Sequence, residues 1–290
     1  MALHLQTFKK RTLTAIVFVV IMLCGLLVSH WSFLLLFSII HAGCWLEYQR
    51  LAGLIDPEYK NISSFHKYGV ILAGWGFMLW MTNDAFIIGD IKLSEIGWFL
   101  MLVTLIALPI NEILLSRQFK LKIIFISLGG LLYISLSCGL MIGLRSEGMI
   151  FSSFFSLDMG LILPFLLIAT IWINDTMAYI VGSLIGKTPL SPISPRKTWE
   201  GTIGGAMLAI TAITILGIIL FKADMTQVLL VTSIACITGI IGDLFESKLK
   251  RRAGVKDSGN IMPEHGGFLD RFDSLLTATI FVWLYVKLFL

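Results

Sequence analysis

Long apolar runs, each near the length of a bilayer-spanning helix, recur along the whole of this sequence. A hydrocarbon core of about 30 Å requires roughly 20 consecutive apolar residues in a helix. Charged residues make up only 14% of the 290 residues, against about 25% in a soluble domain. Lipid-facing surface must therefore replace the missing charge, and the sequence predicts an all-α polytopic integral membrane protein.

The runs predict about nine transmembrane helices. The first is expected to be retained, because its apolar run exceeds the 7 to 15 residues usual in a signal peptide and a second run follows at once. The predicted spans are residues 12–29, 31–51, 68–81, 91–115, 122–144, 160–184, 202–221, 228–245 and 272–290. We expect the first five, in residues 1–158, and the last four, in residues 159–290, to form a single membrane unit.

The placement of Lys and Arg predicts the orientation. An alternation that starts from a cytoplasmic N-terminus puts 18 of the 22 basic residues on the cytoplasmic side, as the positive-inside rule requires. The exceptions are Lys92, Arg145, Lys222 and Lys287. The net charge of +4 is small and does not indicate a nucleic-acid partner.

The densest polar chemistry lies in residues 247–273, SKLKRRAGVKDSGNIMPEHGGFLDRFD. Basic residues come first, and Asp270 and Asp273 stand three apart where the last apolar run begins, a spacing that places them on one face of a helix. Mg²⁺ takes oxygen ligands, commonly one or two carboxylates with substrate phosphates and water. The basic residues would hold phosphates, and Gly266 and Gly267 would let backbone come close. We expect a phosphate-handling metal site at a membrane surface; a merely solvated loop is the alternative.

Asp243 lies near the end of the 228–245 run, after Gly239 and Gly242. A lone carboxylate at that depth is unfavourable. A metal ion shared with Asp270 and Asp273 would remove the penalty. A neutralising contact with Lys248 or Arg251 is the alternative.

A second polar block, NDTMAYIVGSLIGKTPLSPISPRKTWEG, covers residues 174–201, and the predicted orientation puts it on the same side as the first. Asp175 lies near the end of the sixth span, and prolines shape the segment that follows. Ser194, Arg196, Lys197 and Thr198 then supply hydroxyls and cations before a helix N-terminus, which favours anions. The alternative is a positive-inside anchor with a proline-stiffened loop, which leaves Asp175 unexplained.

Glu112, inside the 91–115 run, is a functional candidate because charges within spans are costly; an interfacial salt bridge with Arg117 is the alternative. A cation-coupled transporter with Asp175, Asp243 and Glu112 along an ion path is a different class of function. It predicts acidic residues near the membrane middle and paired half-helices, whereas the polar residues here cluster at one interface.

These residues resemble the signatures of the phosphatidate cytidylyltransferase family, the CDP-diacylglycerol synthases. The pattern S-x-x-K-R-x-x-x-x-K-D-x-G followed by P-x-H-G-G-x-x-D-R-x-D is matched by Ser247, Lys250, Arg251, Lys256, Asp257, Gly259, Pro263, His265, Gly266, Gly267, Asp270, Arg271 and Asp273. The pattern D-T-x-A-Y-x-x-G through S-P-x-K-T-x-E-G is matched by Asp175, Thr176, Ala178, Tyr179, Gly182, Ser194, Pro195, Lys197, Thr198, Glu200 and Gly201. Met177, Ser183 and Glu264 depart from the residues common in the family.

The resemblance implies transfer of a cytidylyl group from CTP to phosphatidic acid, giving CDP-diacylglycerol and pyrophosphate. It implies Mg²⁺ held by Asp243, Asp270 and Asp273, with Asp175 a further candidate for the same cluster, and it leaves open a second cation such as K⁺. A CTP-dependent transferase or kinase acting on a polyprenol or an ether lipid is the nearest alternative. The bacterial inner membrane is the expected location, and a homodimer through apolar helices is expected from the family.

The resemblance also distributes the remaining roles. Lys197, Lys250, Arg251, Lys256 and Arg271 would bind the triphosphate and the lipid headgroup, and Ser194, Thr198 and His265 would donate hydrogen bonds to phosphate. We place Lys256, His265 and Arg271 with the acidic residues in the catalytic set. Arg196, Ser247, Asp257, Gly266 and Gly267 complete the predicted substrate-binding set.

Overall fold

The computed structural model describes residues 5–114, 120–151, 158–260 and 266–290, with side chains from residue 14 onward except those of 148–151. Its elements are helical apart from two short hairpins, which confirms the all-α polytopic fold class. The helices are α1 (Leu5–Leu27), α2 (His30–Ile55), α3 (Pro57–Lys60), α4 (Ser64–Trp80), α5 (Leu93–Leu114), α6 (Leu121–Gly130), α7 (Leu136–Phe151), α8 (Met159–Ile185), α9 (Trp199–Phe221), α10 (Met225–Arg252) and α11 (Leu269–Phe289). A π-helical turn, η2 (Leu131–Ser135), joins α6 to α7, and a 3-10 turn, η1 (Asn83–Ala85), follows α4.

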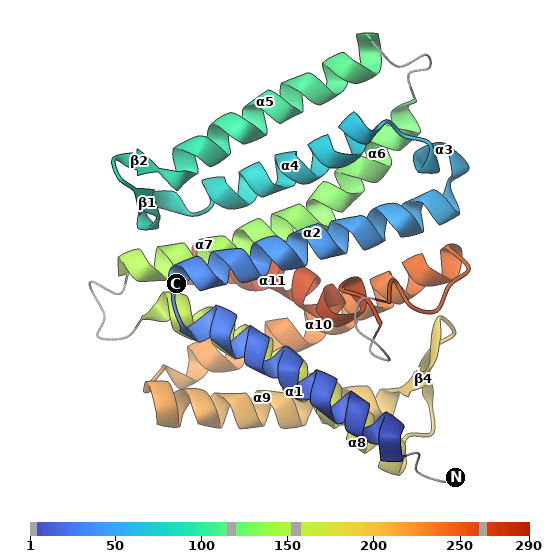
Figure 1. Cartoon of the computed structure of the whole chain (residues 1–290). Coiled ribbons are helices and arrows are strands. Elements are labelled where there is room, and N and C mark those ends of the chain that lie inside the picture. Colours follow the sequence, from blue (N-terminus) through green and yellow to red (C-terminus); the bar gives the residue numbers. More distant parts are fainter. Residues whose placement is uncertain (1–4, 115–119, 152–157, 261–265) are drawn as a thin grey trace.

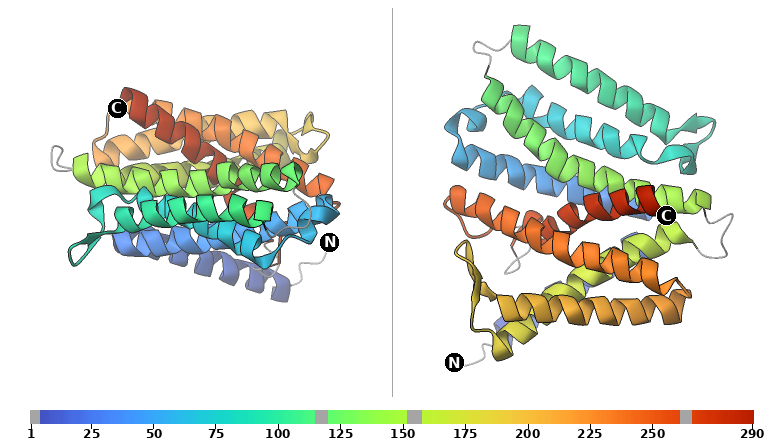
Figure 2. Two further views of the ribbon diagram at one scale, coloured as in Figure 1. Left: turned by 90° about the horizontal axis from the view of Figure 1, so that it is seen from above. Right: turned by 180° about the vertical axis from the view of Figure 1, so that it is seen from behind.

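The long helices run back and forth between two ends of the molecule (Figure 1). At one end, on the right of Figure 1, lie the start of α1, the short helix α3, the hairpin β3 (Pro189–Ser191) with β4 (Ser194–Thr198), and the connection from α10 to α11. The other end carries the C-terminus and the hairpin β1 (Ile87–Ile88) with β2 (Ile91–Lys92). Figure 2 shows the same division from above and from behind. Both polar sequence blocks therefore lie at one end, which we call the signature end.

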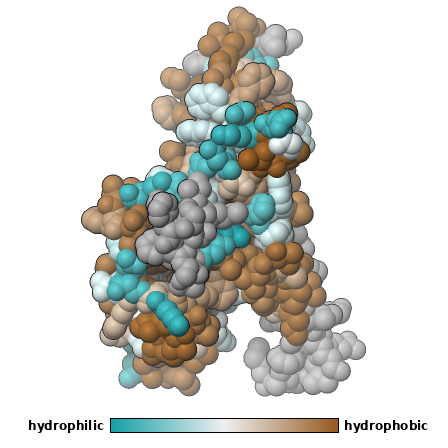
Figure 3. Space-filling view, turned by 90° about the vertical axis from the view of Figure 1, so that its left-hand side faces the viewer, coloured by the Kyte–Doolittle hydropathy of each residue, from teal (hydrophilic) through white to brown (hydrophobic). Residues whose placement is uncertain are grey.

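Seven helices in the described part of the chain are long and apolar enough to cross a membrane. They are His30–Ile55, Leu93–Leu114, Leu121–Glu147, Met159–Ile185, Trp199–Phe221, Met225–Arg252 and Leu269–Phe289. The other two predicted spans also fold as helices, but α4 has 17 residues and α1 offers the shorter apolar stretch Thr14–Leu27. A count of nine spans and the orientation stay predictions. Figure 3 views the end opposite the signature end, where hydrophilic residues gather over part of the face and hydrophobic residues border them.

Most long helices begin at a residue that caps their free backbone amides. Ser29, Ser63, Asp158, Thr198 and Asp224 accept a hydrogen bond from an amide in the first turn of α2, α4, α8, α9 and α10. Such side chains satisfy one of the amides that a helix start leaves without an intrahelical partner. Helix α11 has no side-chain cap of its own, and its first amides are satisfied from another part of the chain, as described below.

Helix α2 lies at the centre of the N-terminal packing. Its Trp45 is fully buried and packs beside Gly130, where a Cβ would collide with the indole ring. The indole Nε1 donates to Ser135 Oγ at 2.8 Å, and His41 Nε2 lies 2.9 Å from the same oxygen. Ser135 belongs to the π-helical turn, a distortion that exposes backbone or side-chain groups in a new direction. This turn therefore fixes the α6–α7 helix against α2.

Two elements differ from the sequence-based expectation. The segment after α8, expected as a proline-shaped loop, contains an antiparallel hairpin in which Pro189 pairs with Thr198 and Ser191 with Ser194. Helix α10 continues to Arg252 instead of ending near residue 245. An ion pair between Glu246 and Lys250, one turn apart, supports the added turns, so hydropathy alone placed the helix end too early.

Candidate active site

A cavity of about 460 Å³ opens at the signature end between α8, the β3–β4 hairpin, α9, α10 and α11. Its volume lies within the range of small-molecule sites, about 300 to 1,000 Å³. Most of the polar lining comes from the 174–201 block, with Asp243 and Ser274 on either side of the 247–273 block, and it consists of Asn174, Asp175, Tyr179, Ser183, Ser194, Arg196, Lys197, Thr198, Thr202, Asp243 and Ser274. The structure thus brings six of the predicted site residues into one cavity, namely Asp175, Ser194, Arg196, Lys197, Thr198 and Asp243.

Close packing of α8 on α9 shapes one wall of the cavity. Gly205 lies so near the Ala178 backbone that a Cβ there would collide with it, and Gly201 is equally close to Gly182. Small residues of this kind let two helices approach within a membrane. Thr198, at the start of α9, caps the helix through its hydroxyl and lines the cavity. These glycines therefore set the distance between Asp175 on α8 and the cations of β4.

An ion pair between Lys197 and Asp243 joins the hairpin to α10 across this cavity. Asp243 also lies 3.5 Å from Ser247 Oγ, which is one turn along α10. The counter-ion of Asp243 is therefore Lys197, from the 174–201 block. The alternative to a shared metal ion, a neutralising contact with Lys248 or Arg251, is wrong, because the helix continues past Asp243 and carries both residues onward.

Two further carboxylates lie within electrostatic reach of Lys197. They are Asp175, which lines the cavity from α8, and Asp273, in the second turn of α11. Asp273 is 8% exposed, and its Oδ1 accepts a hydrogen bond from the Ser274 amide at 2.6 Å. Gly242 packs against the Asp273 backbone without room for a Cβ, so α10 and α11 are in close contact beside the cavity.

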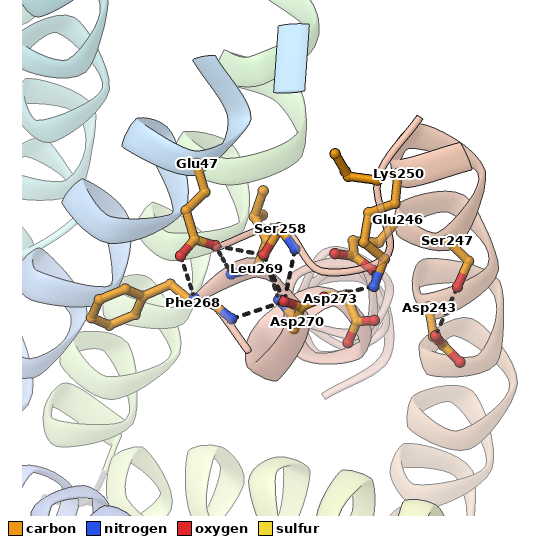
Figure 4. A network of polar contacts seen from close by, with 12 residues as sticks. Glu47, Asp243, Glu246, Ser247, Lys250, Ser258, Phe268, Leu269, Asp270 and Asp273 are labelled. Carbon is orange, nitrogen blue, oxygen red and sulfur yellow. Dashed lines mark hydrogen bonds and ion pairs between the residues drawn. The ribbon is translucent and has the colours of Figure 1, made fainter. Parts of the chain in front are cut away.

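A second group of charges lies next to the cavity, between α10 and α11 (Figure 4). Lys250 pairs with Glu246 and donates to Asp270 Oδ1 at 2.6 Å. Asp270 Oδ2 accepts hydrogen bonds from the Ser258 amide at 2.9 Å and the Gly267 amide at 2.8 Å, and it lies 2.9 Å from the Ser258 hydroxyl. Both oxygens of Asp270 are therefore engaged within the protein.

Gly266 and Gly267 lie close to carboxylate oxygens of the protein itself. Gly266 has a φ of +82°, which favours glycine, and a Cβ there would meet Asp270 Oδ2. A Cβ at Gly267 would collide with the Glu47 carboxylate. The close backbone approach that the sequence predicts is thus made toward Asp270 and Glu47, while contact of these glycines with a substrate stays a prediction.

Other predicted residues lie outside the cavity lining. Arg251, Lys256 and Asp257 are exposed at the end of α10 and on the loop that follows, and Ser247 is 9% exposed on α10. Arg271 is exposed and within electrostatic reach of Asp175. His265 lies outside the described residues. Among the described residues, no group of three or more His, Cys, Asp or Glu side chains is arranged to hold a metal ion.

Three residues of these networks were not predicted from the sequence, namely Glu47, Glu246 and Ser258. Glu47 lies near the end of the predicted span 31–51. A carboxylate inside an apolar run is in itself a sign of a functional or paired charge. Glu246 precedes Lys250 by four residues, the spacing of a helical ion pair. No feature of the sequence distinguishes Ser258, which contacts two carboxylates, from a serine that faces solvent.

Comparison with known proteins identifies the family of this chain. The model of the cytidylyltransferase family matches residues 9–289. A phosphatidate cytidylyltransferase of Bacillus subtilis is 33% identical over 285 residues, which cover 97% of this chain and 98% of that protein. One of Staphylococcus saprophyticus is 33% identical over 272 residues, covering 92% and 95%. One of Staphylococcus haemolyticus is 53% identical over 108 residues, covering 37% and 42%. The chain belongs to the cytidylyltransferase family.

Proposed function

We propose that the protein transfers the cytidylyl group of CTP to phosphatidic acid and releases pyrophosphate. A phosphate oxygen of the lipid attacks the α-phosphorus of CTP, and the bond from that phosphorus to the pyrophosphate oxygen breaks. The observation that carries the proposal is the cavity in which Lys197 of the 174–201 block meets Asp243 of α10. The relatives that match nearly the whole chain are named for this reaction.

The attacking oxygen is already anionic, so the reaction needs no strong general base. It requires two polyanions to come together and the leaving pyrophosphate to be stabilised, which is the work of positioned cations. Lys197 and Arg196 line the cavity and supply positive charge there. Ser194 and Thr198 hydroxyls, on the same wall, can donate to phosphate oxygens. Lys256, His265 and Arg271, all in the 247–273 segment, are proposed to contact the phosphates as well.

The carboxylates around the cavity fit Mg²⁺, because oxygen donors are the ligands that this ion prefers. Asp243 Oδ2 is buried beside the cavity, where it forms the ion pair with Lys197. One or two protein carboxylates suffice when substrate phosphates complete the coordination. We propose Asp243 and Asp273 as the ligands, with Asp175 beside them. Asp270 is the weakest candidate, because its oxygens are already within hydrogen-bond distance of Lys250, the Ser258 amide and hydroxyl, and the Gly267 amide. A bound Mg²⁺, with or without a second cation such as K⁺, would neutralise charge on the phosphates.

The proposed location is the bacterial inner membrane with the signature end in the cytoplasm. Phosphatidic acid stays in the bilayer and CTP is water-soluble, so the two can meet only at the interface. The biased placement of Lys and Arg supports this orientation. A homodimer stays an expectation from the family.

The test is a reaction with purified protein in lipid nanodiscs, CTP, MgCl₂ and phosphatidic acid. We expect pyrophosphate release that depends on the lipid, together with CDP-diacylglycerol in the lipid extract by mass spectrometry. A polyprenol and an archaetidic-type ether lipid are offered in parallel. Turnover with either of these and none with phosphatidic acid would replace the proposed substrate, and no CTP turnover with any of them would overturn the activity.

A further inference from the structure

Glu47 connects the N-terminal helices to the start of the last helix. It lies on α2 and is 4% exposed. Its Oε1 accepts the Phe268 amide at 2.9 Å, and its Oε2 accepts the Leu269 amide at 2.9 Å and the Ser258 hydroxyl at 2.6 Å. Figure 4 shows the side chain reaching from α2 to these groups. The acidic side chain of one early helix therefore holds a segment more than 200 residues later.

These bonds replace the cap that α11 lacks. Leu269 is the first residue of α11 and Phe268 is its N-cap residue, whose side chain makes no capping hydrogen bond. A helix start carries free amides and a partial positive charge, so a carboxylate there is favourable. Among the ion pairs of the described residues, none involves Glu47. The start of α11 thus provides the compensation for the buried charge of Glu47.

The loop between α10 and α11 is shaped to admit this carboxylate. A Cβ at Gly259 or at Gly267 would collide with its oxygens, and one at Gly43, one turn earlier on α2, would collide with the Phe268 ring. Gly259 and Gly267 both stand at fixed positions of the signature. The absence of their side chains is therefore explained by a residue that lies outside the signature.

The contact extends from Glu47 into the charged residues of α10 and α11. The Ser258 hydroxyl lies 2.6 Å from Glu47 Oε2 and 2.9 Å from Asp270 Oδ2. Asp270 in turn accepts Lys250 at 2.6 Å. Asp273 follows one turn further along the same helix, so the axial position and rotation of α11 at its start decide where the Asp273 carboxylate lies.

We propose that Glu47 is a positioning residue for cytidylyl transfer: it docks the start of α11 on α2 and so places Asp273 beside Lys197 and Asp243. Glu47 does not line the cavity and need not touch substrate. This inference rests on the proposed function for its kinetic consequences and on geometry alone for the docking. A purely stabilising role would lower the amount of folded protein without changing the properties of the folded fraction.

The kinetic test compares Glu47→Gln with wild-type protein and with Glu112→Gln. Gln puts an amide NH₂ where a backbone N–H requires an acceptor, at nearly unchanged volume. Glu112 is a carboxylate of the N-terminal helices with a 12% exposed side chain, and it pairs with His66 away from α11. We expect kcat to fall about tenfold or more in Glu47→Gln, as for residues that orient metal ligands. The Mg²⁺ concentration for half-maximal rate should rise, and Glu112→Gln should keep the wild-type Mg²⁺ dependence.

Hydrogen–deuterium exchange tests the docking without any turnover. Peptides that cover residues 258–272 should exchange faster in Glu47→Gln than in wild type, while peptides from α4 and α5 should not change. Unchanged exchange there, or a lower rate with an unchanged Mg²⁺ dependence, would overturn the inference. If instead wild type fails to turn over CTP while the mutant still exchanges faster, the docking stands and the proposed function fails. Glu47→Ala removes both carboxylate oxygens and so all three contacts. It serves as a second variant in case the Gln amide rotates to keep two of them.

Discussion

The N-terminal and C-terminal helices both bury ionisable side chains, but they neutralise them in different ways. Between α4, α5 and α6, His66 contacts Glu112 at 2.7 Å and Ser127 at 2.8 Å, enclosed by packed helices. Around the cavity, by contrast, Lys197 and Lys250 lie among five carboxylates, those of Asp175, Asp243, Glu246, Asp270 and Asp273. Glu246 Oε2 is held by its ion pair with Lys250, and Glu246 Oε1 is buried without a hydrogen-bond donor among the described residues.

This difference is the one expected between a structural polar network and the proposed binding site. Buried polar groups that have all their partners contribute packing and specificity. Clustered carboxylates beside a cavity are costly for the protein alone, and the proposed Mg²⁺ would offset that cost. Five measurements test whether this contrast holds.

Asp243→Asn should have the largest effect on activity. The change keeps the shape and removes the charge that pairs with Lys197, so we expect the rate of pyrophosphate release to fall at least about 10²-fold, as for loss of one preorganised electrostatic group. Asp224→Asn is the matched control, because Asp224 caps the opposite end of the same helix and Asn caps as well as Asp. Near-normal activity of Asp243→Asn would remove this residue from the metal site.

Lys197→Met should weaken the use of CTP by about 10- to 100-fold. The loss should appear mainly as a higher KM for CTP if Lys197 binds the triphosphate in the ground state. Lys197→Arg keeps the charge and should retain more activity than Lys197→Met. Equal kinetics for the two variants would show that the charge of this residue is not used.

Asp270→Asn should act on stability more than on chemistry. It removes an acceptor from a buried set of donors made up of Lys250, the Ser258 hydroxyl and two amides, so unfolding in detergent should become easier by about 1–3 kcal/mol. Activity per folded molecule should fall less than in Asp243→Asn. A loss of activity equal to that of Asp243→Asn, with unchanged thermal stability, would instead place Asp270 on the metal.

His66→Phe should lower stability and leave turnover per folded molecule unchanged. The substitution removes one hydrogen-bonding partner from Glu112 and one from the Ser127 hydroxyl, at a cost of roughly 1–3 kcal/mol. Thermal unfolding monitored by tryptophan fluorescence measures this change. An altered KM for CTP would mean that the N-terminal network communicates with the cavity.

The smallest expected effect is a pH dependence at Asp56. A hydrogen bond from Lys122, helped by the Glu58 amide, lowers the pKa of Asp56 below its ordinary value. A lowered pKa in the folded state contributes stability that is present above the unfolded value, roughly pH 4, and is lost as the pH falls through the folded value. Thermal unfolding measured between pH 7 and pH 3 should show a slightly flatter acid decline in Asp56→Asn than in wild type.

Much of the fold was readable from hydropathy. The nine apolar runs all contain a helix, and seven helices are long enough to span a membrane. Their ends were less predictable, because charged residues continue a helix when they pair one turn apart, as Glu246 and Lys250 do at the end of α10. The β3–β4 hairpin was missed because its three prolines indicated only that a helix could not continue.

The candidate site was predictable in composition and only partly in arrangement. The two polar blocks stand out because charge is rare elsewhere, and the structure places five predicted residues of the 174–201 block in one cavity with Asp243. Pairings between them depend on helix packing, so the Lys197–Asp243 contact could not be chosen over nearer cations in the sequence. Glu47 was missed for the same reason, since its partners lie at the other end of the chain.

The bond from α2 to α11 also bears on how the protein is made. Glu47 is synthesised long before Ser258, Phe268 and Leu269, the groups that satisfy it. During translation α2 must therefore enter the membrane interface with its acidic side chain still hydrated or provisionally paired. The signature end can reach its final structure only after α11 has been synthesised. A chain that stops short of α11 therefore lacks more than one wall of the cavity. It also leaves the Glu47 carboxylate of an early helix without the Phe268 and Leu269 amides that satisfy it in the folded protein.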